Sequence, residues 1–159
     1  MATFKDFGPY LTYAESVKSQ TATLKGIENI PNQDQYDNMI EVYHDFYEPC
    51  CRHFGIKFPV PSFFRSVKLN KAIGGAATSA HMAGCAIDMD ADTVPGVSNR
   101  QLFDWIRANL KFDQLILESP DQHGNPQWVH VANNREGKPN RQQVLKMTRI
   151  NGKPVYETI

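Results

Sequence analysis

The sequence has little cysteine, no excess of charge of either sign and no long apolar run. Its three cysteines, Cys50, Cys51 and Cys85, form neither a C-x-x-C pair nor an even set, which excludes a disulfide framework and a cysteine zinc site. We expect them to be small buried hydrophobes of a protein made in a reducing compartment. Seventeen basic and seventeen acidic residues give zero net charge, and no run approaches the ~18 apolar residues of a membrane span. We therefore expect neither nucleic acid nor membrane as a partner.

The chain has material for one core and shows no sign of division. Its 159 residues are 41% hydrophobic, without an internal repeat or a linker between two parts. We expect a single domain over residues 1–159, with an irregular N-terminal segment at 1–31 packed on it, and a monomer. The first seven residues have no apolar signal core, so no signal peptide is expected.

The hydrophobic pattern predicts an α+β fold, with a few helices packed against a small, mostly antiparallel sheet. Capping boxes that begin at Asn32 and Ser98 precede apolar residues at helical spacing. They predict one helix over about 33–53, bent near Pro49, and a second whose apolar face extends to Leu110. A short helical turn is expected at 67–73. The predicted strands cover residues 56–60, 85–89, 114–118, 128–132, 143–150 and 153–158, with Asn151-Gly152 as the turn of a hairpin between the last two.

Two histidines and one aspartate are candidates for a shared site on this sheet. His81 precedes the strand at 85–89, Asp88 lies within it, and His130 lies in the strand at 128–132. Gly84 and Ala86 share the strand face of Asp88 and leave space beside its carboxylate. Each histidine by itself is more often a core residue bonded to backbone, and the spacing alone is a weak signal. Together the three residues suit a catalytic zinc with an open fourth position, and equally a non-haem iron.

Glu118 is the candidate general base. If Ile116 lies opposite His130 in a hairpin of the two central strands, Glu118 lies opposite Trp128. Glu118 and His130 then share one face of the sheet. A carboxylate there could take a proton from a water whose pKa a metal ion lowers to about 7. The alternative is an exposed carboxylate at the end of a strand.

The residues around these candidates resemble a known family. The segment Ser79-x-His81-x-x-Gly84-x-Ala86-x-Asp88, followed by Trp128-Val129-His130, resembles the zinc-dependent D-alanyl-D-alanine metallocarboxypeptidases and related phage endolysins. The resemblance covers most of the chain in the order of the family. The further segments that carry it are an arginine loop at 64–75 and the phage-type segments at 15–29, 112–118 and 140–145.

The resemblance implies one zinc ion and a set of residues around it. His81, Asp88 and His130 match the zinc ligands of the family. Arg65 matches the arginine that holds the carboxylate of the peptide, a role that suits a planar and permanently charged guanidinium. Ser79 matches a serine that helps to hold the substrate.

The sequence departs from the family pattern at two positions. Many relatives have an acidic residue three places before the last histidine ligand, where this chain has Gln127. An amide cannot take a proton, so Glu118 is expected to be the base. The arginine loop has Phe64 where the family usually has a glycine, which affects the shape of the pocket.

The predicted function is a zinc-dependent peptidase that cleaves peptidoglycan stem peptides, of D-Ala-D-Ala carboxypeptidase or endolysin type. The alternative is a non-catalytic metal-binding module of a phage particle, either structural or wall-binding. A non-haem iron oxygenase would share the ligand types and leave Arg65 and Ser79 unexplained. The missing signal peptide fits a phage-type protein, so we expect a phage-encoded protein that is made in the bacterial cytoplasm and acts at the cell wall after release.

Overall fold

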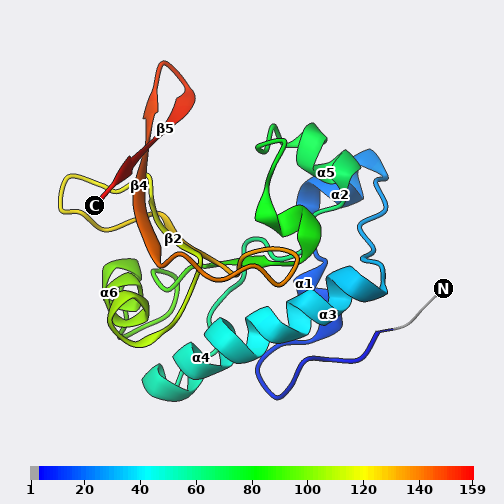
Figure 1. Ribbon diagram of the computed structural model, residues 1–159, viewed down its shortest axis with the longest axis horizontal. Coiled ribbons are helices and arrows are strands. Elements are labelled where there is room, and N and C mark those ends of the chain that lie inside the picture. Colours follow the sequence, from blue (N-terminus) through cyan, green and yellow to red (C-terminus); the bar gives the residue numbers. More distant parts are fainter. Residues whose placement is uncertain (1–3) are drawn as a thin grey trace.

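One five-stranded sheet organises the molecule. A computed structural model describes residues 4–159, and Figure 1 shows α3, α4 and α6 on one side of the sheet, with α2 and α5 on the other. The strands lie in the order β1-β3-β2-β4-β5, and all neighbours are antiparallel except β2 and β4. Their bounds are β1 Ala86–Met89, β2 Gln114–Glu118, β3 Trp128–Ala132, β4 Gln143–Ile150 and β5 Lys153–Thr158. The predicted α+β class and mostly antiparallel sheet are confirmed.

The longest helical segment consists of three consecutive elements. These are α3 (Gln33–Val42), a wider π-helical turn η1 (Tyr43–Tyr47) and α4 (Glu48–Phe54). The predicted capping box of Asn32 with Gln35 is present. The wide turn comes just before Pro49, whose ring would collide with the carbonyl four residues earlier in a regular helix. The second predicted helix is α6 (Asn99–Asn109), with its capping box at Ser98.

The N-terminal segment differs from the irregular chain that the sequence predicts. It contains α1 (Tyr13–Ser16) and α2 (Gln20–Lys25), which Thr12 and Ser19 cap through their side chains. Helices this short show no clear hydrophobic period, so the pattern did not reveal them. Residues 1–3 of the predicted segment lie outside the described residues, and the assignment of 1–159 to one domain stays a prediction.

The predicted strand at 56–60 is wrong. The segment is irregular, and its backbone groups have other partners than a sheet ladder. The Phe58 carbonyl accepts a hydrogen bond from the Tyr47 hydroxyl (2.6 Å), and the Pro59 carbonyl accepts one from the Asp90 amide. Pro59 has no N–H to donate to a neighbouring strand. Two further short helices, α5 (Val67–Ala72) and the 3₁₀ turn η2 (Ala80–Ala83), precede β1.

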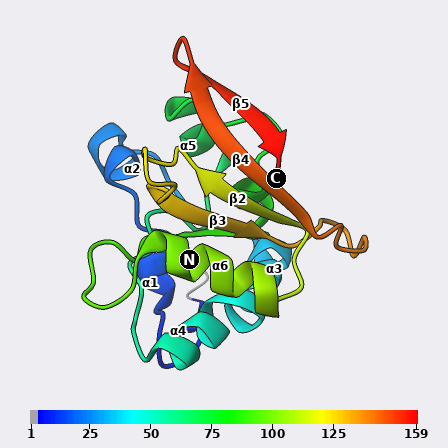
Figure 2. The ribbon, with the colours of Figure 1, turned by 90° about the vertical axis from the view of Figure 1, so that its left-hand side faces the viewer.

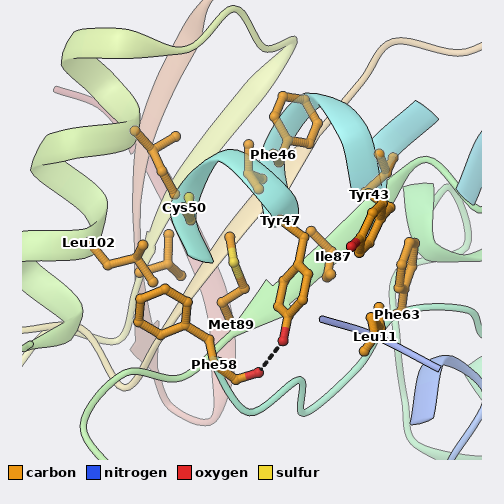
Figure 3. Close-up of a cluster of buried hydrophobic side chains, with 14 of the residues drawn as sticks. Leu11, Tyr43, Phe46, Tyr47, Cys50, Phe58, Phe63, Ile87, Met89 and Leu102 are labelled. Carbon is orange, nitrogen blue, oxygen red and sulfur yellow. Dashed lines mark hydrogen bonds between the residues drawn. The ribbon is translucent and has the colours of Figure 1, made fainter. Parts of the chain in front are cut away.

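The main hydrophobic core lies between the helices and one face of the sheet. Figure 3 shows aromatic side chains of the long helical segment, among them the fully buried Phe46 and Tyr47, packed against Ile87 and Met89 of β1. Figure 2 shows the same layering from a view turned by 90°. The three cysteines are buried and form no disulfide within residues 4–159, as predicted. No helix in this range has the length and apolar character that crossing a membrane requires.

Candidate active site

The other face of the sheet brings Asp88, His130 and Glu118 together. Asp88 of β1 pairs with His130 of β3, and Glu118 of β2 pairs with Trp128. Ile116 pairs with His130, so the register expected from the sequence is confirmed. Because side chains alternate along a strand, Glu118 lies on the same face as His130.

His81 reaches this face from η2, which α3 holds in place. Gly84 ends η2 in the left-handed conformation (φ 74°), and a Cβ there would overlap the Gln35 carbonyl oxygen. The Gln35 side chain donates to the Met82 carbonyl (3.1 Å), and the Asn38 side chain donates to the Ala83 carbonyl (2.9 Å). Sequence reasoning identified Gln35 only as a capping residue and missed Asn38. Neither contact leaves a local signal, because the partners lie more than forty residues apart.

Two imidazole nitrogens and one carboxylate oxygen converge at the centre of the site. Asp88 Oδ1 lies 3.2 Å from His81 Nε2 and 2.9 Å from His130 Nδ1, and the three candidate ligand atoms all lie within 4.8 Å of one another. Two ligands of a tetrahedral zinc, each about 2.0–2.1 Å from the ion, are about 3.3–3.4 Å apart. The three side chains could therefore hold one metal ion after slight outward movements.

The hydrogen bonds of His81 favour this interpretation. Its Nδ1 lies 2.7 Å from the Phe63 carbonyl oxygen, which only accepts, so Nδ1 carries the proton. Nε2 then carries no proton and has a free lone pair. It is buried without a hydrogen-bond partner among residues 4–159. A lone pair that faces the Asp88 carboxylate at 3.2 Å is repelled unless a cation lies between them. The orphaned nitrogen and the hydrogen-bonded Nδ1 are what a metal-binding histidine requires.

Burial and charge set the protonation of these groups. Burial lowers the pKa of His81, which favours the neutral form that binds metals. Burial alone would raise the pKa of Asp88, yet the electrostatic effect of the neighbouring histidines and the hydrogen bond to His130 bring it below its ordinary value. Burial raises the pKa of Glu118 to about 7, and the charge of Asp88 acts in the same direction. Glu118 is thus a buried carboxyl that exchanges its proton near neutral pH.

Arg65 lies beyond the outer edge of β1. The amide of Asp88 donates to the Ser62 carbonyl (2.8 Å), which places the segment that carries Arg65 beside this strand. The Arg65 guanidinium donates to Asn70 Oδ1 (3.2 Å), and its buried Nε has no partner within residues 4–159. Burial lowers its pKa, while the charges of Asp88 and Glu118 oppose this shift. Arg65 lines a cavity of about 440 Å³ together with Lys18.

Asn29 holds the segment of Arg65 to the N-terminal helices. Its side-chain nitrogen donates to the carbonyls of Val17 (2.9 Å) and Phe64 (3.0 Å), and its Oδ1 accepts from the Ser66 amide (2.7 Å). The N-terminal segment, predicted to be irregular, therefore positions the arginine. Buried Asn29 satisfies backbone groups on both sides of it, which is the usual role of a buried amide.

The remaining predicted residues lie at the margins of the site. Ser79 precedes η2, two positions before His81, and is half-buried. Gln127 is exposed just before β3, and its backbone amide donates to the Glu118 carbonyl (2.9 Å). Of the two positions considered for the base, only Glu118 is a buried carboxyl.

Two comparisons with known proteins bear on this site. The comparison with curated proteins gave no match. The family model described as Peptidase M15 matches residues 9–132, well over half of the chain. The matched range includes Arg65, His81, Asp88, Glu118 and His130 and ends with β3. The chain therefore belongs to the peptidase M15 family, the zinc D-Ala-D-Ala carboxypeptidase-like peptidases.

Proposed function

We propose that this protein is a zinc-dependent carboxypeptidase that removes the terminal residue of peptidoglycan stem peptides. Membership of the M15 family supports a zinc peptidase acting on peptidoglycan. The observation that carries the proposal is the orphaned Nε2 of His81, which faces the Asp88 carboxylate beside His130. In this proposal His81, Asp88 and His130 hold the ion. A bound zinc ion supplies a Lewis acid that polarises a peptide carbonyl and lowers the pKa of water.

Glu118 is proposed to move the proton. A general base works best when its pKa lies near the working pH; burial raises the pKa of Glu118 in the metal-free protein, and the charge of a bound zinc ion would lower it again and keep the carboxylate ready to accept a proton. Its carboxylate takes a proton from the attacking water and passes it to the departing amine. Glu118 shares the sheet face of His130, which supports this position for the transfer. Gln127 has no part in it, because an amide cannot accept the proton.

Arg65 is proposed to bind the carboxylate at the end of the peptide. The guanidinium is half-buried and donates one hydrogen bond, to Asn70, so it has N–H groups left for a ligand. The guanidinium also borders a cavity of about 440 Å³, which none of the candidate metal ligands lines. An arginine beside the site favours release of the last residue over cleavage inside the peptide. Ser79, two positions before His81, is proposed to contact the substrate as well.

The test is turnover of a defined substrate by the metal-loaded protein. Zinc content is measured on purified protein, and a synthetic stem pentapeptide ending in D-Ala-D-Ala is incubated with it, with and without a chelator. We expect one zinc per chain and release of free D-alanine that the chelator abolishes. Cleavage at an internal bond would replace the carboxypeptidase by an endolysin-type peptidase. A zinc-loaded protein that cleaves neither bond would instead be a non-catalytic metal-binding module.

A further inference from the structure

The β4–β5 hairpin lies outside the range that matches the family model and yet extends the candidate site. The match ends at residue 132, and β4 begins at Gln143. In Figure 1 the hairpin rises on the same side of the sheet as α2 and α5, away from α3, α4 and α6. β4 pairs with β2, so hairpin residues on the face of Glu118 continue that face outward.

The strand register identifies these residues. Glu118 pairs with Met147 of β4, and Met147 pairs with Tyr156 of β5, so the three form one row across the sheet. Two strand spacings separate the backbones of Glu118 and Tyr156, a distance of about 10 Å. Arg149 follows Met147 by two residues and therefore points to the same face.

The site face carries a small apolar cluster beside these two side chains. Ile116, Leu145 and Met147 are buried together and belong to a cluster separate from the main core. Tyr156 is half-exposed next to this cluster, and Arg149 is exposed. The Arg149 guanidinium donates one hydrogen bond to the Gly152 carbonyl (3.2 Å) and keeps further N–H groups for a ligand. Tyrosine and arginine are enriched at protein-binding surfaces.

The charges of the site extend to the hairpin. Burial raises the pKa of the Tyr156 hydroxyl, the negative charges of Glu118 and Asp88 add to this effect, and Arg149 opposes it. Arg149 likewise lowers the pKa of Glu118 in opposition to burial. These groups therefore lie within electrostatic reach of one another.

We infer that Tyr156 and Arg149 bind the part of the substrate on the opposite side of the scissile bond from Arg65, and that this part carries a carboxylate. The inference rests on the proposed peptidase function. Arg65 lies beyond β1 at one end of the sheet, and Tyr156 lies on β5 at the other end. A peptide that crosses between them passes over the strands of Asp88, His130 and Glu118. The tyrosine ring packs on the peptide, and the guanidinium pairs with its carboxylate.

A binding experiment without turnover tests this inference. The parent protein carries Glu118→Gln, is loaded with zinc, and is titrated calorimetrically with two synthetic stem pentapeptides. One peptide carries a free side-chain carboxylate on a residue that precedes the terminal D-Ala-D-Ala dipeptide. In the other peptide this carboxylate is replaced by an amide. Tyr156→Ala and Arg149→Gln are added to the parent. The matched controls are Val155→Ala and Lys153→Gln, exposed positions of β5 whose side chains alternate to the other face.

The two hairpin changes have different expected signatures. Tyr156→Ala weakens the binding of both peptides by about tenfold. Arg149→Gln weakens only the acidic peptide, by about three- to tenfold, and so removes the preference of the parent for it. The controls change either dissociation constant by less than about twofold.

The inference is overturned if the hairpin variants bind like their controls, if the parent does not prefer the acidic peptide, or if the parent binds neither peptide. Failure of the proposed function is a separate result, because it appears as uncut peptide with the zinc-loaded wild-type protein. The titration needs no cleavage and decides the inference in either case.

Discussion

The two faces of the sheet use the same strands for opposite purposes. On β3, Val129 and Val131 are completely buried against the helices, while Trp128 and His130 point to the other face. On β1, β2 and β3 the face that packs on α3, α4 and α6 is apolar, whereas the site face holds a buried carboxyl and an orphaned imidazole nitrogen. Burying polar groups without partners costs free energy. We infer that the apolar face supplies the stability that keeps the polar groups of the site face in place.

The largest expected effect is loss of the metal ion from the site face while the apolar face keeps the protein folded. His130→Ala removes one of three candidate ligands, and two ligands rarely hold a catalytic zinc. We expect the zinc content to fall from one per chain to almost none, while circular dichroism shows a folded protein. His123→Ala, an exposed histidine of the loop before β3, is the matched control and keeps its metal. Full zinc occupancy in His130→Ala would contradict the ligand assignment.

Glu118→Gln tests the chemistry of the site face without removing the metal. The amide is close in size to the carboxyl but cannot take a proton. We expect kcat to fall by roughly 10²–10⁴-fold, the usual contribution of a positioned base, with zinc content unchanged. Glu157→Gln, an exposed carboxylate of β5, serves as control in the same assay. Equal rates for the two variants would remove Glu118 from the reaction.

Phe46→Ala tests the apolar face. The ring is completely buried in the main core, and its removal leaves a cavity. We expect the free energy of unfolding to fall by about 3–5 kcal/mol, measured by urea titration, with one zinc per folded chain. Leu24→Ala at a largely exposed position should change it by less than about 0.5 kcal/mol. A similar loss in both variants would place Phe46 outside the core.

The site face should also make the metal-free protein pH-sensitive. Folding raises the pKa of Glu118 to about 7, so the folded state holds this proton more tightly than the unfolded state. The stabilisation is complete below the unfolded pKa of about 4.3 and is lost as the pH rises through about 7, a difference of about 4 kcal/mol. Urea titrations from pH 4 to 8 give the free energy of unfolding of the metal-free wild type and of Glu118→Gln, and the difference between the two curves isolates the contribution of Glu118. Parallel curves for the two proteins would show that Glu118 titrates normally.

The smallest expected effect concerns the contact through which α3 positions η2, the turn that carries His81. Asn38→Ala removes the hydrogen bond from α3 to the Ala83 carbonyl at the end of η2. We expect zinc affinity to fall by about tenfold, because partners that orient a metal ligand contribute to its binding. Competition with a zinc-binding dye measures it, and Asn109→Ala at the exposed end of α6 is the control. An unchanged affinity would mean that η2 keeps its shape without α3.

Local chemistry made several elements predictable. The capping boxes at Asn32 and Ser98 and the Asn151-Gly152 turn involve residues a few positions apart, and all three mark the elements that the structure contains. The strand at 56–60 was predicted because residues such as Ile56, Phe58 and Val60 favour strands. In the structure the Phe58 carbonyl instead accepts a hydrogen bond from Tyr47. Such competition between partners distant in the chain leaves no mark in a local pattern.

The candidate site was likewise predictable only in part. The alternation along β2 and β3 was enough to place Glu118 and His130 on one face, while His81 and Asp88 were grouped with His130 by their residue types and by the family resemblance. The contacts that aim them were not predictable. Asn38 and Asn29 act on segments more than thirty residues away, and their amide side chains would read as ordinary surface residues.

The sequence by itself determined most of the helices and strands and the apolar face of each, because these depend on neighbours at periods of two and 3.6 residues, and it named His81, Asp88 and His130 as the candidate donor set. Only the tertiary structure decided how β4 joins β2 in parallel and so brings Tyr156 and Arg149 to the site face. Parallel pairing closes a long loop, and its free energy depends on the packing of the whole sheet.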